Sequence, residues 1–546
     1  MQFAAMIGTR DVFLEACPGA GKTTAVAGRV AWLHGQGAKL ALISFTNTGA
    51  DEMSLKVKRD HGVALNGEGF SGTIHSFLQK YVLTPFAHIL VGGSTAVRID
   101  PEMVRSMDPP NIDTTRYTYH SDGRIGHNDP SKSLEAGDDV AAIGDAKQQA
   151  ILAGFVTPND AIYWSVRVLA EVPGVAAALA RRFDEIIVDE AQDTSRLQLW
   201  SLSWIKANGL GSLVLVGDYD QSIYAFNGAS TDDCKESARK WGLHSQPLTE
   251  NYRSSQRICD AAGRLRGAIP PDVAVGSDKD CQIPPLVFRY SPGQEQGISA
   301  RFQALASAHG IESSDAVVLA ASNATCAQIR GERLDLLPRD LTILFEAKTL
   351  TSGPTMALYR KVENLLRRLA FGGRPNTADP LTVRNHVVQL IEALPTPAGD
   401  VRSWAETSVR VTDSLVRAIT PNPESSLELE LSSVLGELKG ASSPTASAPI
   451  RVSTIHGVKG ESIGAVALVM SPQTDRQRQY GYPGPAGVLA ARLGDPMTST
   501  LDDDESLRRS YVAMTRARKL LAIGIPSTDD PPVLQNFLRA GFHLVS

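Results

Sequence analysis

The stretch "ACPGAGKTT" at residues 16–24 decides the fold of this chain. It joins an apolar run, "DVFLEA" (11–16), to "KTTAVAGRVAWLHGQG" (22–37), whose apolar spacing and closing glycine predict a helix. A glycine-rich turn between a buried strand and a helix N-terminus is the pattern of a phosphate-binding loop. The alternative is a glycine-rich turn without a ligand. The flanking strand and helix favour the phosphate loop, because they are the context that it requires.

Each residue type in this loop has a chemical reason. Gly19 and Gly21 let the backbone approach closely, so that its N–H groups can surround phosphate oxygens. The helix that follows directs its positive end at the anion. Lys22 is expected to reach the outer phosphates, and the hydroxyl of Thr23 to bind Mg²⁺. The predicted nucleotide-binding residues of the loop, with an alanine in the position of the first glycine, are Ala16, Pro18, Gly19, Ala20, Gly21, Lys22, Thr23 and Thr24.

A second apolar run, "IIVDEAQD" (186–193), ends in acidic residues. Asp189 at the strand end is predicted to hold Mg²⁺, through water, and Glu190 to take a proton from an attacking water. An acidic pair after a strand is also a common solvated strand end. Together with the phosphate loop, the pair favours nucleotide hydrolysis.

Short apolar strands alternate with helices along much of the chain, which predicts an α/β fold with parallel sheets covered on both faces. A second set of strands begins at "AVVLAASN" (316–323) and continues at "VALVM" (466–470) and "LLAIGIP" (520–526). Between these sets the pattern is mainly helical. The sequence therefore predicts two sheet-based lobes, each with a mainly helical insertion, and ligands at the carboxyl ends of the strands.

Composition narrows the class of protein. The 546 residues are 42% hydrophobic and 21% charged, as in folded proteins, and the net charge is -5. A chain that is not basic overall can hold nucleic acid only along a local stripe or groove. The five cysteines form no CxxC pair, which predicts a reduced, cytoplasmic protein without zinc or disulfides. The start lacks the pattern of a signal peptide, and no stretch approaches the roughly 18 apolar residues of a membrane span.

Six more stretches identify a family resemblance. They are "ISFTNTGADEM" (43–53), "GTIHSF" (72–77), "VGDYDQSIYAFNGA" (216–229), "LTENYRSSQ" (248–256), "VSTIHGVKGES" (452–462) and "RRSYVAMTRARK" (508–519). In order and rough spacing they resemble the superfamily 1 DNA helicases of the UvrD, Rep and PcrA group. The resemblance covers nearly the whole chain. It implies two RecA-like lobes with ATP and Mg²⁺ between them, single-stranded or tailed duplex DNA across their tops, and 3′-to-5′ movement.

The resemblance assigns roles around ATP. Gln221 matches the residue that senses the γ-phosphate, and Arg253 and Arg516 match two arginines that neutralise transition-state charge, in the role of an arginine finger. For each arginine the alternative is a surface salt bridge. Gln2 lies where the family places an adenine-reading glutamine, although it is nearly the first residue, and Tyr252 matches a ring that stacks on adenine. The family's "KGLEF" is here "KGESI", so the ribose-binding position is filled by Glu461, shifted by one, or by Ser462; we favour Glu461.

The resemblance also assigns a DNA path. The matching positions are Phe45, Thr46, Asn47, His75, Tyr224, Phe226 and His456. Aromatic stacking suits a motor that ignores sequence, because every base has a π-face. The family's "WRGA" is here "FNGA", so Phe226 replaces tryptophan and Asn227 replaces arginine, and both changes are expected to weaken the grip on DNA. The alternative for Tyr224 and Phe226 is packing in the core.

The domain boundaries follow from the positions of these motifs. The expected parts are 1–78 and 171–268 for the first RecA-like lobe, 79–170 for its insertion, 269–348 and 448–546 for the second lobe, and 349–447 for a reduced second insertion.

The small second insertion, with no nuclease motif after "TRARK", resembles the helicase subunit of Gabija-type phage-defence systems, which work beside a separate OLD-family nuclease. Two functions are therefore expected from the sequence. One is an ATP-dependent 3′-to-5′ DNA helicase or translocase, as in DNA repair. The other is a DNA-responsive ATPase subunit that regulates a partner nuclease in antiviral defence and unwinds little by itself.

Overall fold

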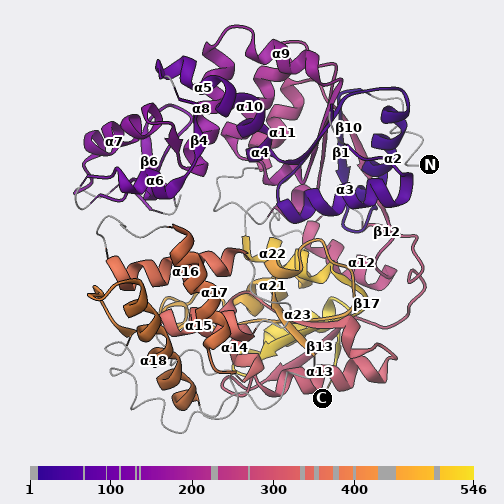
Figure 1. Ribbon diagram of the computed structural model, residues 1–546. Coiled ribbons are helices and arrows are strands. Elements are labelled where there is room, and N and C mark those ends of the chain that lie inside the picture. The colour runs from indigo at the N-terminus through magenta and orange to yellow at the C-terminus, as the bar shows by residue number, and fades with distance from the viewer. Residues whose placement is uncertain are drawn as a thin grey trace.

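Two separate halves, each built on one six-stranded parallel sheet, make up the molecule (Figure 1). The structure is a computed structural model. It describes residues 10–65, 68–93, 95–109, 112–128, 132–134, 137–222, 231–267, 271–331, 339–349, 356–372, 380–396, 401–427, 450–496 and 505–545. The α/β class with two RecA-like lobes, each carrying additional helices, is confirmed.

The first sheet has the strand order β10-β1-β9-β8-β2-β3. Its strands are β1 (Val12–Ala16), β2 (Leu40–Ser44), β3 (Phe70–Thr73), β8 (Glu185–Asp189), β9 (Ser212–Gly217) and β10 (His244–Leu248). Side chains alternate between the two faces, since successive residues of a strand point to opposite sides. Val12 and Leu14 pack under α2 (Lys22–Gly35) and α3 (Asn47–His61). Phe13 belongs to the opposite core, which is covered by α4 (Ile74–Leu78), α8 (Pro158–Glu171), α9 (Val175–Arg182), α10 (Arg196–Ala207) and α11 (Thr231–Lys240).

The second sheet has the order β15-β14-β16-β17-β13-β18. Its strands are β13 (Leu286–Tyr290), β14 (Ala316–Ala320), β15 (Arg451–Thr454), β16 (Ile463–Val469), β17 (Ala517–Pro526) and β18 (His543–Leu544). One face packs on α13 (Gly297–Ala308) and α14 (Asn323–Arg330). The other packs on α12 (Gln256–Gly263), α21 (Pro485–Gly494), α22 (Glu505–Met514) and α23 (Pro531–Arg539). Helix α12 thus shares the core of the second sheet, although the expected boundary at 268 assigned it to the first lobe. The five boundaries between the six expected parts themselves stay predictions.

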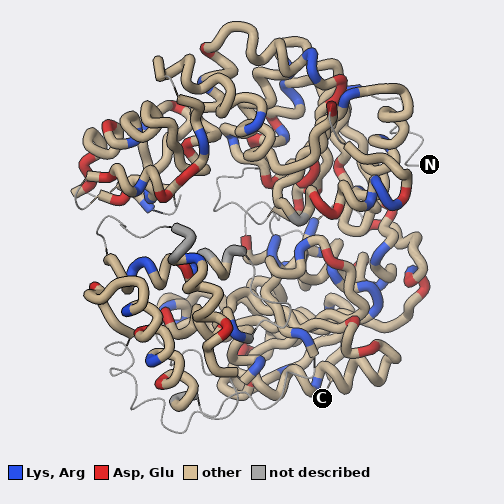
Figure 2. Tube along the Cα trace, in the orientation of Figure 1, with Lys and Arg blue, Asp and Glu red and all other residues tan. Residues whose placement is uncertain are grey.

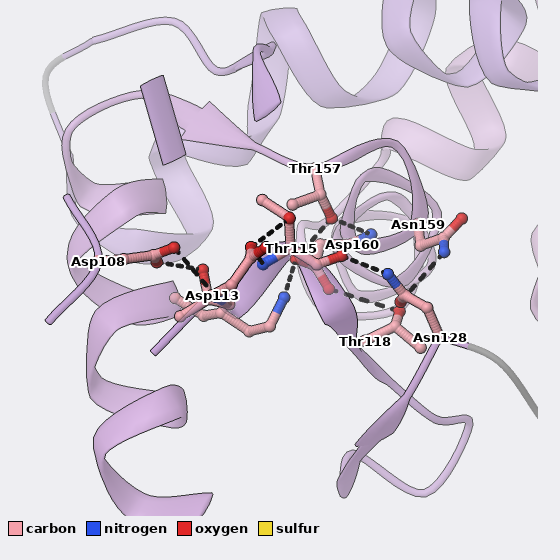
Figure 3. A network of polar contacts seen from close by, with 10 residues as sticks. Asp108, Asp113, Thr115, Thr118, Asn128, Thr157, Asn159 and Asp160 are labelled. Carbon is pink, nitrogen blue, oxygen red and sulfur yellow. Dashed lines mark hydrogen bonds and ion pairs between the residues drawn. The ribbon is translucent and has the colours of Figure 1, made fainter. Parts of the chain in front are cut away.

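The segment between residues 80 and 157 contains more than helices. Besides α5 (Thr84–Val91), α6 (Pro101–Ser106) and α7 (Val140–Leu152), it holds the paired short strands β4 (Arg98–Ile99) and β7 (Phe155–Val156) and a hairpin, β5 (Tyr117–Tyr119) and β6 (Ile125–His127). Figure 3 shows the polar network that joins them. Buried Asp160 accepts a hydrogen bond from Thr157 Oγ1 at 2.8 Å and pairs with Lys147 at 2.5 Å. Side-chain hydrogen bonds therefore order a stretch whose composition resembles a loop.

Helices of the second insertion form a core of their own. They are α15 (Arg339–Thr349), α16 (Met356–Phe371), α17 (Pro380–Ala393) and α18 (Val401–Ile419). Leu358, Val362, Leu365 and Leu369 of α16 are buried on one face, as their spacing predicts. Among the described residues, no single helix is long and apolar enough to cross a membrane, and only the bent pair α8 and α9 meets the criteria of length and composition together.

A buried ion pair ties the helix after the glycine loop to the first sheet. Arg29 on α2 donates from Nε to Oε1 of Glu185 at 2.7 Å and from Nη2 to Oε2 at 2.6 Å, and both side chains are at most 3% exposed. Two parallel hydrogen bonds of this kind fix geometry as well as charge.

We expect Arg29→Ala to lower the free energy of unfolding of the first lobe by about 3–5 kcal/mol, because it leaves the Glu185 carboxylate buried without a partner. Denaturant unfolding of the full chain, followed by tryptophan fluorescence, measures this loss. The control Arg29→Met/Glu185→Leu removes both charges and should stay close to the parent protein. Equal losses in the single and the double variant would assign the effect to packing.

Candidate nucleotide site between the lobes

The glycine loop lies at the carboxyl end of β1, where it turns into α2. Gly19 and Gly21 both have φ of +74°, a left-handed conformation that glycine adopts at no steric cost. Space is also restricted at Gly19, because an added Cβ would lie 2.6 Å from Cβ of Arg253 and 2.7 Å from Oδ1 of Asn251. The loop is held by the hydrogen bond from Cys17 N to Leu248 O at 2.9 Å. Lys22 and Thr23 then occupy the first turn of α2, beside the helix's positive end.

Two acids at the carboxyl end of β8, Asp189 and Glu190, lie close to Lys22 of this turn. Asp189 is buried, and its Oδ1 has no hydrogen-bond partner among the described residues. Burial and the neighbouring charge of Glu190 raise the pKa of Asp189, while Lys22 opposes the shift. A buried carboxylate oxygen of this kind is a ligand for a hard cation. The unpartnered oxygen of Asp189 and the Thr23 hydroxyl fit Mg²⁺, for which water and phosphate oxygens would complete the ligand set. Among the described residues there is no cluster of three or more His, Cys, Asp or Glu that could hold a metal ion.

Glu190 has the environment of an ionised acceptor. Burial alone would raise its pKa, but the charges of Lys22 and Lys459 and a hydrogen bond from Gln192 outweigh burial and lower the pKa below its usual value. Its φ of +53° is unusual for a residue with a side chain. This backbone conformation ends β8 at Asp189 and leads into the 3₁₀ turn Ala191–Asp193, so Glu190 does not continue the strand.

Gln192 connects this acidic loop to the end of β9, a role that no motif predicted. Its Nε2 donates to Glu190 Oε2 at 2.6 Å, and its Oε1 accepts from the backbone N–H of Asp218 at 3.0 Å. Gly217 permits the approach, because an added Cβ there would lie 2.4 Å from Gln192 Oε1. The "AQD" after the acidic pair was the available signal.

Figure 2 shows both basic and acidic segments where the two halves adjoin. Two arginines, Arg253 and Arg516, lie close to each other in the structure. Buried Arg516 precedes β17 in the second lobe; it donates from Nη2 to Gln221 Oε1 and from Nε to Val512 O at 3.1 Å. Gln221, on the 3₁₀ turn Tyr219–Gln221 of the first lobe, donates in turn to Asp218 Oδ2 at 2.6 Å. Arg253 donates to Thr515 O at 3.0 Å.

Neither arginine has the partner that a buried cation normally has. Across the described part of the chain, no carboxylate lies at ion-pair distance from Arg253 or Arg516. Burial lowers the pKa of Arg516, and burial together with the charge of Arg516 lowers that of Arg253 to about 9. The repulsion between the two guanidinium groups is only partly compensated by Glu190, so an anion bound at the glycine loop would stabilise both. The structure thus brings together Lys22, Asp189, Glu190, Gln221, Arg253 and Arg516.

Comparison with known proteins finds a similarity in the first lobe. The family described as UvrD/REP helicase N-terminal domain matches residues 2–121 and 126–240. This part of the chain is thus similar to the N-terminal domain of UvrD-like helicases.

Individual proteins of the UvrD-like group are also similar to this chain. ATP-dependent DNA helicase UvrD1 of Mycobacterium tuberculosis (strain ATCC 25618 / H37Rv) is 30% identical over 289 residues, which cover 46% of this chain and 37% of the relative. DNA helicase II of Escherichia coli (strain K12) is 26% identical over 279 residues, with 47% and 38% covered. ATP-dependent DNA helicase PcrA of Leuconostoc citreum is 24% identical over 343 residues, with 58% and 46% covered. The chain therefore spans less than half the length of each of these relatives. None of the three bears on the Gabija-type resemblance, which stays a prediction.

The positions expected around adenine and ribose are only partly described. Tyr252 lies beside the UvrD-like glycine loop, where its backbone N–H donates to Gly19 O at 2.9 Å and its hydroxyl to Glu250 Oε2 at 2.8 Å. Its ring is exposed and free to receive a flat ligand. Glu461 forms a bidentate pair with Arg451 at 2.7 and 2.8 Å, and Ser462 is exposed. The choice between Glu461 and Ser462 stays open, and Gln2 lies outside the described residues.

The positions expected to contact DNA lie at carboxyl ends of strands. Phe45, Thr46 and Asn47 follow β2, and Thr46 caps α3 by accepting from Gly49 N at 3.0 Å. His75 follows β3 and has a pKa lowered by burial, and His456 follows β15 in the second lobe. Parallel strands have their carboxyl ends at the same edge of a sheet. The residues after β2 and β3 therefore share one edge of the first sheet, and His456 lies at the corresponding edge of the second sheet. Tyr224 and Phe226 lie outside the described residues, and their assignment stays a prediction.

Lys459 is a second residue that sequence reasoning missed. From the loop between β15 and β16 it pairs with Asp193 in the first lobe, and its Nζ lies 3.5 Å from Glu190 Oε2. Asp193 is 1% exposed; burial raises its pKa to about 6 although Lys459 opposes the shift. The lysine of "HGVKGES" was the signal, but only the fold shows that it crosses between lobes.

Replacing Lys459 with Met is expected to speed hydrogen exchange of the backbone amides at 455–462 by at least about 10-fold. The reason is that breaking a buried pair from one side costs about 3–5 kcal/mol, and each 1.4 kcal/mol or so is tenfold in an equilibrium. Mass-spectrometric exchange on the full chain measures it. Lys240→Met, which removes a surface pair with Glu236, is the matched control and should change nothing there. Unchanged exchange at 455–462 in Lys459→Met would mean that this pair does not hold the lobes together.

Proposed function

We propose that this chain is an ATP-dependent DNA helicase or translocase that hydrolyses ATP between its two lobes and moves 3′ to 5′ along single-stranded DNA. The observation that carries the proposal is the convergence of Arg253 and Arg516, without carboxylate partners, on a glycine loop and its lysine. A triphosphate is the anion that suits such a pocket, because its charge would compensate three cations at once. The direction of movement rests on the resemblance to the UvrD-like group.

The residues divide the work of hydrolysis. Backbone N–H groups of the glycine loop and Lys22 bind the phosphates. Glu190, ionised at neutral pH, is placed to accept a proton from water. Arg253 and Arg516 neutralise the charge that develops on the phosphoryl group. Mg²⁺ held by Asp189 and Thr23 would add charge neutralisation on the phosphate oxygens.

Coupling to DNA would run through the segment after β9. Gln221 binds Arg516 of the other lobe and Asp218 of its own turn, so it responds to any change in lobe separation. The residues that follow it carry the two rings predicted to stack on bases. All three relatives named above are DNA helicases by name, and two of them are ATP-dependent DNA helicases by name, which supports the proposal.

Lys22→Ala is expected to reduce ATP turnover to background, because charge compensation at the phosphates is lost in the transition state as well as in binding. Steady-state ATPase assays with and without oligo(dT) measure the change. Glu190→Gln is the companion variant. It should bind ATP and turn it over at least about 100-fold more slowly, since only proton removal is lost. Near-parental DNA-stimulated turnover in Lys22→Ala would remove the phosphate-loop assignment.

Arg516→Ala should lower kcat for ATP by about 10³-fold or more, the effect of removing an arginine that stabilises phosphoryl-transfer charge. KM should change less, because the contact matters most in the transition state. Arg518→Ala, two residues along and paired with Asp315 away from the site, is the control. A decrease of less than tenfold in Arg516→Ala would make Arg516 a structural residue.

Strand separation decides between the two functions expected from the sequence. A helicase separates a 3′-tailed duplex in an ATP-dependent manner. ATPase activity stimulated by single-stranded DNA without strand separation would instead favour the DNA-responsive ATPase subunit.

A further inference from the structure

An exposed loop with two tyrosines and two arginines leaves the second sheet between β16 and α21. It contains the short helix α20 (Asp475–Gln479), on which Arg476 and Arg478 are both exposed. Tyr480 and Tyr482 follow, with 61% and 63% of their surface exposed. None of the motifs that carry the resemblance includes this loop.

Backbone hydrogen bonds give the loop a defined shape. Thr474 and Gln477 form a reciprocal capping box at the start of α20, with distances of 2.9 and 3.2 Å. Gly481 has φ of +68°, which turns the chain so that Tyr482 N donates to Gln477 O at 2.9 Å. Gln473 Nε2 donates to Tyr482 O at 2.5 Å. The two rings are therefore held out by an ordered backbone, with centroids 6.4 Å apart and a tilt of 32°.

The exposure of these rings calls for a ligand. Among the described aromatic residues they are the most exposed, ahead of Tyr252 at 52%. Tyr252 is the ring that the resemblance assigns to adenine. Scattered apolar residues on a surface need no explanation, but adjacent rings presented together with cations form the combination that binds single strands.

The loop lies at the edge of the second sheet that the DNA path is expected to follow. It leaves the carboxyl end of β16, which neighbours β14, and β14 neighbours β15, the strand that leads to His456. Ser471 Oγ lies 3.5 Å from Thr325 Oγ1 of α14, which links the start of the loop to the carboxyl end of β14. A single DNA strand that passes His456 in the direction of β16 would then reach Tyr480 and Tyr482.

Charge at the loop favours a polyanion. Arg476 and Arg478 precede the two rings along the chain. Arg289 of β13 donates to Ser527 O at 2.6 Å. Asp529 lies near Arg289 and Arg478. Burial and the charge of Asp530 raise its pKa, although the two arginines oppose this shift. The exposed side chains of the loop include Arg476, Arg478, Tyr480 and Tyr482, together with the uncharged Thr474 and Gln479.

We propose that Arg476, Arg478, Tyr480 and Tyr482 form a binding site for single-stranded DNA that extends the path beyond His456. The rings stack on bases and the guanidinium groups bind the flanking phosphates. This inference rests on the proposed function, because it assumes that the strand crosses the carboxyl edge of the second sheet.

The test uses the full chain and fluorescently labelled oligo(dT) strands of graded length. Tyr480→Ala/Tyr482→Ala should bind long strands at least about 5-fold more weakly, because each ring that stacks on a base contributes about 1–3 kcal/mol. It should bind the shortest strands as the parent does, because these do not reach the loop. Tyr480→Phe/Tyr482→Phe keeps the rings and should restore affinity. Arg476→Gln/Arg478→Gln should flatten the plot of log K against log salt by up to about 1.4, from two phosphate contacts of about 0.7 each.

The control Arg181→Gln/Arg239→Gln removes two exposed arginines from helices that lead into the amino ends of β8 and β10, so its salt slope should equal the parental slope. Equal affinity of the parent and the double alanine variant for every strand length would overturn the inference while leaving DNA-stimulated ATPase intact. A loss of affinity for blunt duplex but not for oligo(dT) would also overturn it. A parent protein that binds no oligo(dT) would instead refute the proposed function.

Discussion

The contact between Arg516 and Gln221 joins two lobes through groups that are both buried. A buried guanidinium is tolerated when its charge is compensated, and here the partners are an amide oxygen and a backbone carbonyl. The nearby charge of Arg253 adds repulsion. The charges of Glu190 and Asp218 compensate Arg516 only in part. An anion in the glycine loop would add compensation, so we expect its binding to strengthen the contact between the lobes.

A chain of hydrogen bonds connects the acidic loop after β8 to the second lobe. Glu190 accepts from Gln192, Gln192 accepts from the backbone of Asp218, and Asp218 accepts from Gln221, which accepts from Arg516. Every link is between a buried or partly buried donor and acceptor, so no link can break without leaving a polar group unpaired. Lys459 makes a second connection between the lobes, since from the second lobe it forms ion pairs with Glu190 and Asp193. The acidic loop beside the glycine loop and the position of the second lobe are thus physically connected.

Local patterns predicted local structure well. The apolar runs at 12–16, 40–44, 185–189 and 212–217 are strands because a parallel sheet buried on both faces requires continuous apolar sequence, and that requirement is visible in each run. The glycine loop was equally readable, since both its glycines are needed for their backbone conformation. What the sequence did not reveal depends on distant partners. Gln192 and Lys459 act through residues up to 269 positions away, and α12 packs on a core formed by strands that come later in the chain.

The acidic composition of the chain constrains how it can hold DNA. A protein with a net charge of -5 gains little from general attraction to a polyanion, so sequence-independent grip must come from local contacts. Stacking supplies such contacts without charge, and its strength does not fall as salt rises in the way that phosphate neutralisation does. The exposed tyrosines after α20, held by backbone hydrogen bonds and flanked by only two arginines on their loop, match that requirement. A motor that grips bases more than phosphates can release and rebind one nucleotide at a time, because each stack is a separate contact that need not disturb its neighbours.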